Sequence, residues 1–211
     1  MTPQTDRGEE TKRRILEMAA EAFAEGGYAG ASLNDVIRRS GLTKGAFYFH
    51  FDSKEALALE VFRHKQEQWM GRVMTRVMGH ERAIDRFLAI PRALVDLIEE
   101  DSSSRSMSRL SRELCRDPQL APKLTPQLEH WVELSADLVR RAQDEGDVRA
   151  DLDPVEVAEV AVAGFLGVEE MCDALSGGED LRRRVDSYIR VFLSALEPSR
   201  SVGADRQPAR G

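Results

Sequence analysis

The residues best suited to chemistry lie between Thr43 and Phe51, where basic, small and aromatic side chains follow one another. Lys44 and Tyr48 are four residues apart, so a helix places both on one face. Between them, Gly45 costs about 1 kcal/mol relative to alanine inside a helix. A bare first turn lets backbone N–H groups and the positive helix end approach phosphates and base edges. The stretch therefore predicts a helix that recognises DNA.

A short helix is expected immediately before this recognition helix. Ser32 followed three residues later by Asp35 resembles a capping box, which marks a helix start. Gly41 should end that helix in the left-handed conformation, and Thr43 should cap the next one. Two short helices around a glycine turn form a helix-turn-helix.

The aromatic residues of the stretch should anchor it in a small core. Phe47 and Phe51 are four residues apart on a different face from Lys44, and Phe49 is expected to be a third apolar anchor. A core helix with no ligand would explain these three rings. It does not explain the side chains that alternate with them, namely Lys44, Tyr48 and His50. This pattern favours DNA recognition.

Apolar residues recur at helical spacing along most of the chain. A helix from about Glu9 should stop at Gly26-Gly27, and Ser53 should cap a long helix that runs towards Met78. Further helices are expected at about 81–100, 107–115, 128–142, 155–175 and 181–196. No strand-like alternation or repeat competes, so the fold is predicted to be all-α.

Several breaks should separate the later helices. Pro91 should kink the helix that contains it, and Asp101–Ser104 is expected to be a loop. A proline-punctuated segment follows, with Pro118, Pro122 and Pro126. Asp153 followed by Pro154 predicts an N-cap and a first-turn proline.

Taken together, these motifs resemble the N-terminal domain of the tetracycline-repressor (TetR) family. The resemblance covers about the first quarter of the chain, and the later helical pattern is compatible with the rest of that family. It is carried by Thr11-Lys12, Gly26-Gly27-Tyr28, Ser32–Ile37, Gly41–Gly45, Tyr48–Phe51 and Ser53–Leu57. It implies a three-helix DNA-binding head and a larger helical body for ligand binding and dimerisation.

The resemblance also implies roles for individual residues. Tyr48, His50 and Lys54 match phosphate-contacting positions of the family, while Thr43, Lys44 and Gly45 match positions that meet phosphate or base edges. The first helix opens with a basic turn that includes Lys12. This turn is either a solvated face or a phosphate contact, and the resemblance favours partial phosphate contact.

The expected domain organisation follows from these patterns. Residues 1–8 should be disordered, 9–55 should form the helix-turn-helix domain, and 56–198 should form the ligand-binding and dimerisation body. Residues 199–211 are expected to be a disordered tail.

Composition limits the remaining possibilities. The net charge is −7, yet residues 1–55 carry eight basic and nine acidic residues, so the acidity lies mainly in the body. An acidic body disfavours indiscriminate adhesion to DNA and leaves a local basic patch to orient docking. No apolar run reaches membrane-spanning length, and the N-terminus lacks the pattern of a signal peptide. A cytoplasmic protein with no membrane contact is expected.

Enzymatic chemistry has little support in the sequence. The four histidines and two cysteines show no metal-ligand spacing, so no metal and no cofactor are expected. No nucleophile elbow, phosphate loop or dinucleotide motif is present. An enzyme on a helical scaffold remains a remote alternative. An architectural DNA-binding protein without a ligand is another.

The last two helices carry more apolar surface than one body needs to bury. The segment Val155–Leu175 is too apolar for a solvent-facing helix, and 181–196 has its own apolar stripe. We therefore expect a homodimer through these two helices, which brings two heads to a palindromic operator.

The inducer pocket is expected around Trp131, whose indole N–H offers one directional donor to a ligand carbonyl. Phe87, Leu88 and Pro91 should form the opposite wall, with Ser135 and Phe165 completing the lining. The segment from Trp131 to Val148 resembles the γ-butyrolactone-receptor branch of the family. This implies a repressor released by a small, largely apolar metabolite. Acyl-CoA or planar hydrophobic drugs are the alternative inducers, and Trp131 as a plain core residue is the alternative role.

Overall fold

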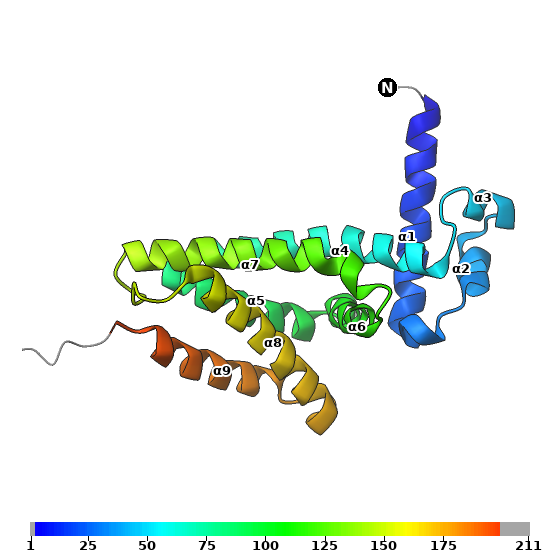
Figure 1. Cartoon of the computed structure of the whole chain (residues 1–211). Helices are drawn as coiled ribbons and strands as arrows, with labels where there is room; N and C mark the ends of the chain where they lie inside the picture. The colour runs from blue at the N-terminus through cyan, green and yellow to red at the C-terminus, as the bar shows by residue number, and fades with distance from the viewer. Residues whose placement is uncertain (1–2, 199–211) are drawn as a thin grey trace, which may run out of the picture. The chain divides into compact units, whose positions relative to one another are not determined.

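The computed structural model describes residues 3–198, and within this range every regular element is an α-helix. The helices labelled in Figure 1 are α1 (Pro3–Gly30), α2 (Leu33–Ser40), α3 (Lys44–Tyr48), α4 (Lys54–Val77), α5 (Ala83–Glu100), α6 (Ser102–Arg116), α7 (Ala121–Asp144), α8 (Pro154–Ser176) and α9 (Leu181–Leu196). The all-α prediction is confirmed.

The chain divides into two compact units. Within the described residues, the first comprises residues 3–79 and Arg92–Trp131, and the second comprises His80–Pro91 and residues 132–198. Helices α5 and α7 each contribute to both units. This division places α4 and α6 in the same unit as α1–α3. The expected domain boundary between residues 55 and 56 stays a prediction.

Helix α1 starts earlier than the sequence pattern indicated. It begins at Pro3, so residues 3–8, expected to be disordered, are helical in the structure. Gly27 interrupts it with φ 69° and ψ 171°, and the last turn continues to Gly30. The expected helix stop is therefore a kink. Met1, Thr2 and the expected disordered tail 199–211 lie outside the described residues.

The caps of the helix-turn-helix are mostly as predicted. Gly41 has φ 67° and ends α2, and the Thr43 hydroxyl accepts the Ala46 N–H at 3.2 Å at the start of α3. Ser53 caps α4 in the same way. The predicted capping box is wrong, because Ser32 occupies the N-cap position without a side-chain bond. Asp35 instead accepts hydrogen bonds from two arginines, Arg38 and Arg39.

The core of the first unit includes two of the three expected phenylalanine anchors. Phe47 and Phe51 are buried among apolar residues of α1, α2 and α4. Phe49 is 85% exposed, so its prediction as a third anchor is wrong. Residues two apart on a helix do not share a face, and α3 ends one residue before Phe49.

Two expected loops are shorter than predicted. Asp101 caps α6 by accepting the Ser104 N–H at 2.6 Å, so the serines after it lie in the first turn of a helix. Helix α7 already includes Pro122 and Pro126, although the sequence pattern placed both in an irregular segment. Pro122 is the second residue of α7, where a backbone N–H has no intrahelical acceptor.

The second unit is organised around α8 and α9. The Asp153 carboxylate accepts the N–H groups of Val155 and Glu156, which confirms the predicted cap with Pro154 in the first turn. The Tyr188 hydroxyl donates to the Ala161 carbonyl at 2.8 Å, across the two helices. A Cβ at Gly164 would approach Tyr188 to 2.6 Å. A glycine is therefore required for this close packing.

Candidate DNA-binding surface and ligand contacts

The first turn of α3 presents an open, basic surface. Thr43, Lys44 and Gly45 are all exposed, and Lys44 makes no hydrogen bond or ion pair with any described residue. A Cβ at Gly45 would meet nothing within 4 Å, so packing inside the chain does not require a glycine there. The Ala46 N–H donates to the Thr43 hydroxyl, so the N–H groups of Lys44 and Gly45 are those that the helix start offers to an anion.

Aromatic side chains continue this surface beyond α3. Tyr48 is 46% exposed, and its ring meets the buried Phe47 ring edge to face, with centroids 5.8 Å apart. The exposed Phe49 ring contacts the His50 ring in the same manner at 5.3 Å. Sequence reasoning missed Phe49 as a surface residue, although its position two residues from both Phe47 and Phe51 was a usable signal.

Lys54 is tied to the kinked end of α1. Its Nζ donates to the Ala29 carbonyl at 3.1 Å and lies 4.8 Å from the centroid of the Tyr28 ring. Burial and the nearby Glu55 carboxylate raise the pKa of Tyr28 to about 12, so the phenol stays neutral at physiological pH. An ammonium has three N–H donors, so Lys54 keeps the capacity to bind a phosphate.

Helix α6 holds the same kink from the other side. The Tyr28 backbone N–H donates to Glu113 Oε2 at 2.5 Å, and Arg109 Nε donates to Glu113 Oε1 at 3.0 Å. A Cβ at Gly27 would approach both of these α6 side chains to 3.0 Å. The turn at Gly27–Ala29 therefore joins α1, α4 and α6 within the first unit.

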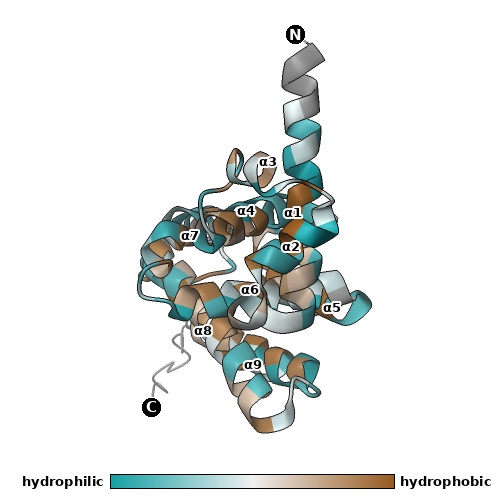
Figure 2. Ribbon diagram, turned by 90° about the vertical axis from the view of Figure 1, so that its right-hand side faces the viewer, coloured by the Kyte–Doolittle hydropathy of each residue, from teal (hydrophilic) through white to brown (hydrophobic). Residues whose placement is uncertain are grey.

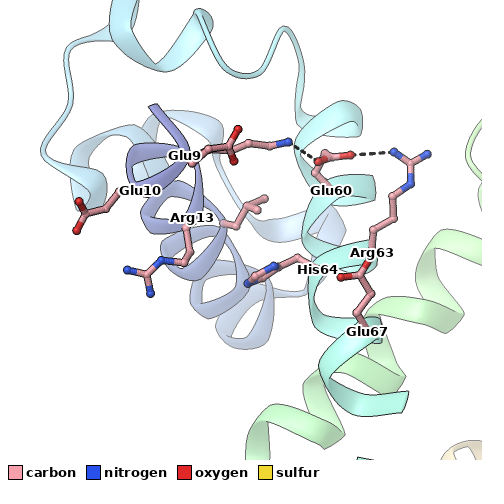
Figure 3. A pocket seen from close by; sticks show the side chains of 9 residues that line it. Glu9, Glu10, Arg13, Glu60, Arg63, His64 and Glu67 are labelled. Carbon is pink, nitrogen blue, oxygen red and sulfur yellow. Dashed lines mark hydrogen bonds and ion pairs between the residues drawn. The ribbon is translucent and has the colours of Figure 1, made fainter. Parts of the chain in front are cut away.

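Lys12 lies in a charged cleft of about 590 Å³ between α1 and α4. Glu60 forms ion pairs with Lys12 at 2.8 Å and with Arg63 at 2.9 Å. Figure 3 labels Glu60 and Arg63 and marks the ion pair between them by a dashed line. The hydrogen bond from Lys12 lowers the pKa of Glu60. A DNA phosphate would therefore have to compete with a carboxylate for Lys12.

The residues expected to line an inducer pocket belong to both units. Trp131 is half-buried at the end of the first unit. In the second unit, Phe87, Ser135 and Phe165 are buried, while Leu88 and Pro91 are partly buried. The Phe87 ring lies 6.2 Å from the Phe192 ring of α9. A pocket shared by all these residues stays a prediction.

Among the described residues of the first unit, two buried side-chain atoms have no hydrogen-bond partner. They are Nε1 of Trp69 on α4 and Oε1 of Gln127 on α7. An unsatisfied buried donor or acceptor costs about 1–3 kcal/mol, so an ordered water or a ligand is the expected partner of each atom. Sequence reasoning chose Trp131 for such an indole, and the structure places an unpartnered one at Trp69.

Other kinds of site have little support in the described part of the chain. Among the described residues, no group of three or more His, Cys, Asp or Glu side chains is placed to hold a metal ion. In the same part of the chain, no helix has the length and apolar character needed to cross a bilayer.

Helices α2 and α3, joined by the turn at Gly41 and packed with α1 in one core, form a helix-turn-helix. Residues 15–61 match the family model described as bacterial regulatory proteins, tetR family. The structure of TylP, a TetR regulator from Streptomyces fradiae, has 30% sequence identity with a TM-score of 0.61, over 92% of this chain and 89% of that one. The chain belongs to the TetR family, whose members are DNA-binding transcription regulators.

Two further relatives are similar over most of the chain. The A-factor receptor protein of Streptomyces griseus is 29% identical over 195 residues, which cover 90% of this chain and 65% of the receptor. The chain thus spans just under two thirds of that receptor. A structure described as the molecular basis for control of antibiotic production by bacterial hormones has 29% identity and a TM-score of 0.72, over 90% of this chain and 98% of that one.

Proposed function

We propose that this protein is a cytoplasmic, ligand-responsive repressor that binds a palindromic operator as a homodimer and leaves it when a small metabolite binds. The observation that carries the DNA-binding part is the open first turn of α3. Lys44 has no partner among the described residues, and Gly45 leaves space that nothing in the chain fills. Both features suit the close approach of a DNA backbone and base edges.

The remaining contacts follow from the same surface. The proposed DNA contacts include Thr43 before α3, Tyr48 at its end and His50 just after it. We add the exposed Phe49 as an apolar contact to sugar or to a thymine methyl group. Lys54 and Lys12 are secondary phosphate contacts, because each is already bound to an oxygen of the protein.

Exposed apolar residues support dimerisation through α8 and α9. Val160 is 57% exposed, Met171 is 47% exposed and Leu175 is 67% exposed on α8, and Val191 is 69% exposed on α9. Along α8 the exposed positions Val160, Ala163, Gly167, Met171 and Ala174 recur every three or four residues. Hydrophobic residues coloured brown recur along both helices in Figure 2. A two-fold interface would bury this stripe.

The inducer that we propose is a small, largely apolar metabolite of the γ-butyrolactone type. The supporting observation is the similarity to the A-factor receptor protein over 90% of this chain. The unpartnered Trp69 N–H would suit a ligand carbonyl, and the unpartnered Gln127 carbonyl oxygen would suit a ligand hydroxyl. Trp131, Ser135 and Phe165 remain candidate wall residues, together with Phe87, Leu88 and Pro91.

A DNA-release assay tests the inducer. Operator-bound wild type, Trp131→Ala and Trp69→Phe are exposed to a panel of butyrolactones, acyl-CoAs and planar drugs. We expect a butyrolactone to release the wild type from the operator. Each variant should need a concentration at least about tenfold higher, since a lost hydrogen bond or ring contact is worth about 1–2 kcal/mol.

Other results of the assay would reassign the protein. Equal release of all three proteins by the active compound would contradict the roles given to both tryptophans. Release by acyl-CoAs or drugs alone would replace the lactone by the alternative inducer class. DNA binding that no compound changes and that shows weak sequence preference would favour an architectural protein. The proposal assigns no catalytic role to the chain.

A further inference from the structure

A second pocket of about 440 Å³ lies within the first unit, between α1, α4 and the first half of α6. Its volume is within the range of small-molecule sites. Apolar side chains from all three helices form much of its lining, namely Ala20, Phe23, Ala24, Val61, Met107 and Leu110. None of the residues expected to bind the inducer lines this pocket.

The polar lining of this pocket, which we call the α1–α6 pocket, is mainly negative. Glu17, Glu21 and Glu25 line it from α1, at intervals of four residues, against one ammonium group, Lys65. Glu17 accepts a hydrogen bond from Lys65 Nζ at 2.5 Å. Glu25 is paired with Arg39, with N···O distances of 2.6 and 2.9 Å.

Glu21 is the third carboxylate of this lining, and it belongs to neither of these pairs. It is exposed, and no described residue donates a hydrogen bond to it or forms an ion pair with it. An apolar lining with one uncompensated carboxylate is complementary to a ligand that has an apolar body and a single positive charge.

We propose that the α1–α6 pocket is a second effector site, which binds amphiphilic organic cations and lowers the affinity for DNA. The position of the pocket is the reason to expect that a bound ligand lowers the affinity for DNA. Helix α6 holds the Gly27–Ala29 turn of α1 through Glu113, and side chains of the same two helices line the pocket. A ligand that binds the DNA-free arrangement more tightly than the DNA-bound one must weaken DNA binding by the same factor.

Titration calorimetry of the full-length protein with decyltrimethylammonium tests this site. Decyl sulfate, with the same chain and an anionic head, is the charge control. Glu21→Gln should weaken binding of the cation about three- to fivefold, as expected for one partly exposed charge pair. Ala24→Trp should abolish binding of the cation, because the larger side chain fills the opening of the α1–α6 pocket. Glu10→Gln removes another exposed carboxylate of α1 outside this pocket and should change nothing.

The same proteins are then titrated with operator DNA, with and without the cation. We expect the cation to weaken operator binding by wild type and Glu10→Gln, and to have little effect on Ala24→Trp. Equal affinity for decyl sulfate, or equal binding by wild type and Ala24→Trp, would overturn the site. Competition between the cation and an active butyrolactone would place the cation in the inducer pocket instead. Unchanged operator affinity with bound cation would overturn the regulatory role.

Discussion

At the scale of single residues, the two lysines near α3 have different surroundings. Lys44 is free of protein partners among the described residues, whereas Lys54 is bonded to Ala29 and lies over the Tyr28 ring. A free ammonium at a helix start can follow DNA geometry, while a bonded one is held in place. The two residues should therefore make distinguishable contributions to binding.

Replacement of each lysine by alanine tests this difference. We expect Lys44→Ala to weaken operator binding more than binding to random DNA, because the first turn of α3 reaches base edges. Lys54→Ala should weaken binding to all sequences alike and lower the slope of log K against log salt by about one unit. The measurement is affinity at several salt concentrations, with Lys123→Ala on α7 as a control. An unchanged slope for Lys54→Ala would make Lys54 only an anchor of the α1 turn.

At the scale of elements, the caps were predictable because they depend on local chemistry. Gly41, Thr43, Ser53 and Asp153 act within one turn of the chain, and the structure confirms all four. Ser32 makes no side-chain cap, and the carboxylate of Asp35, the other member of the expected capping box, accepts from two arginines instead. Those hydrogen bonds depend on neighbours that a capping pattern does not include.

Features that depend on tertiary packing could not be predicted. The hydrogen bond between the Tyr28 N–H and Glu113 joins residues 85 positions apart. The burial of Nε1 of Trp69 and the pairing of Lys12 with Glu60 also depend on how helices distant in sequence pack. The spacing of apolar residues along the sequence does not indicate such contacts. The helix-turn-helix was predictable because its residues are consecutive in the sequence. The DNA contacts assigned to it stay predictions.

The Glu113 contact supports a prediction for stability. Glu113→Ala leaves the part-buried Tyr28 N–H without its acceptor, so unfolding should require about 1–3 kcal/mol less free energy. Arg109→Ala removes the ion pair but keeps the carboxylate, and should cost at most about 0.5 kcal/mol. Urea denaturation at fixed protein concentration measures both. Similar losses in the two variants would mean that Glu113 acts through Arg109 rather than through the turn.

At the scale of the whole molecule, the account requires two copies of the chain. A palindromic operator needs two heads related by a two-fold axis. The exposed apolar stripe of α8 and α9 is the proposed interface, because so much adjacent apolar surface is costly to leave in water.

Charged substitutions in this stripe should dissociate the dimer. We expect Val160→Glu combined with Met171→Glu to give a folded monomer, since a two-fold axis brings each new charge into the interface twice. Sedimentation at micromolar concentration is the measurement, with circular dichroism to monitor helix content. Met78→Glu, which changes a residue of similar exposure (56%) at the end of α4, is the matched control. A wild type that sediments as a monomer would remove the dimer from the account.

The most direct test of the central claim is selection of binding sites from a random DNA library with the full-length protein. The account predicts that one inverted repeat is enriched, with half-site centres spaced by whole helical turns of DNA. It also predicts that Lys44→Ala no longer enriches this sequence, while the monomeric α8 variant enriches at most one half-site. Enrichment of no sequence, or of the same site by wild type and Lys44→Ala, would contradict a dimeric repressor that reads its operator through α3.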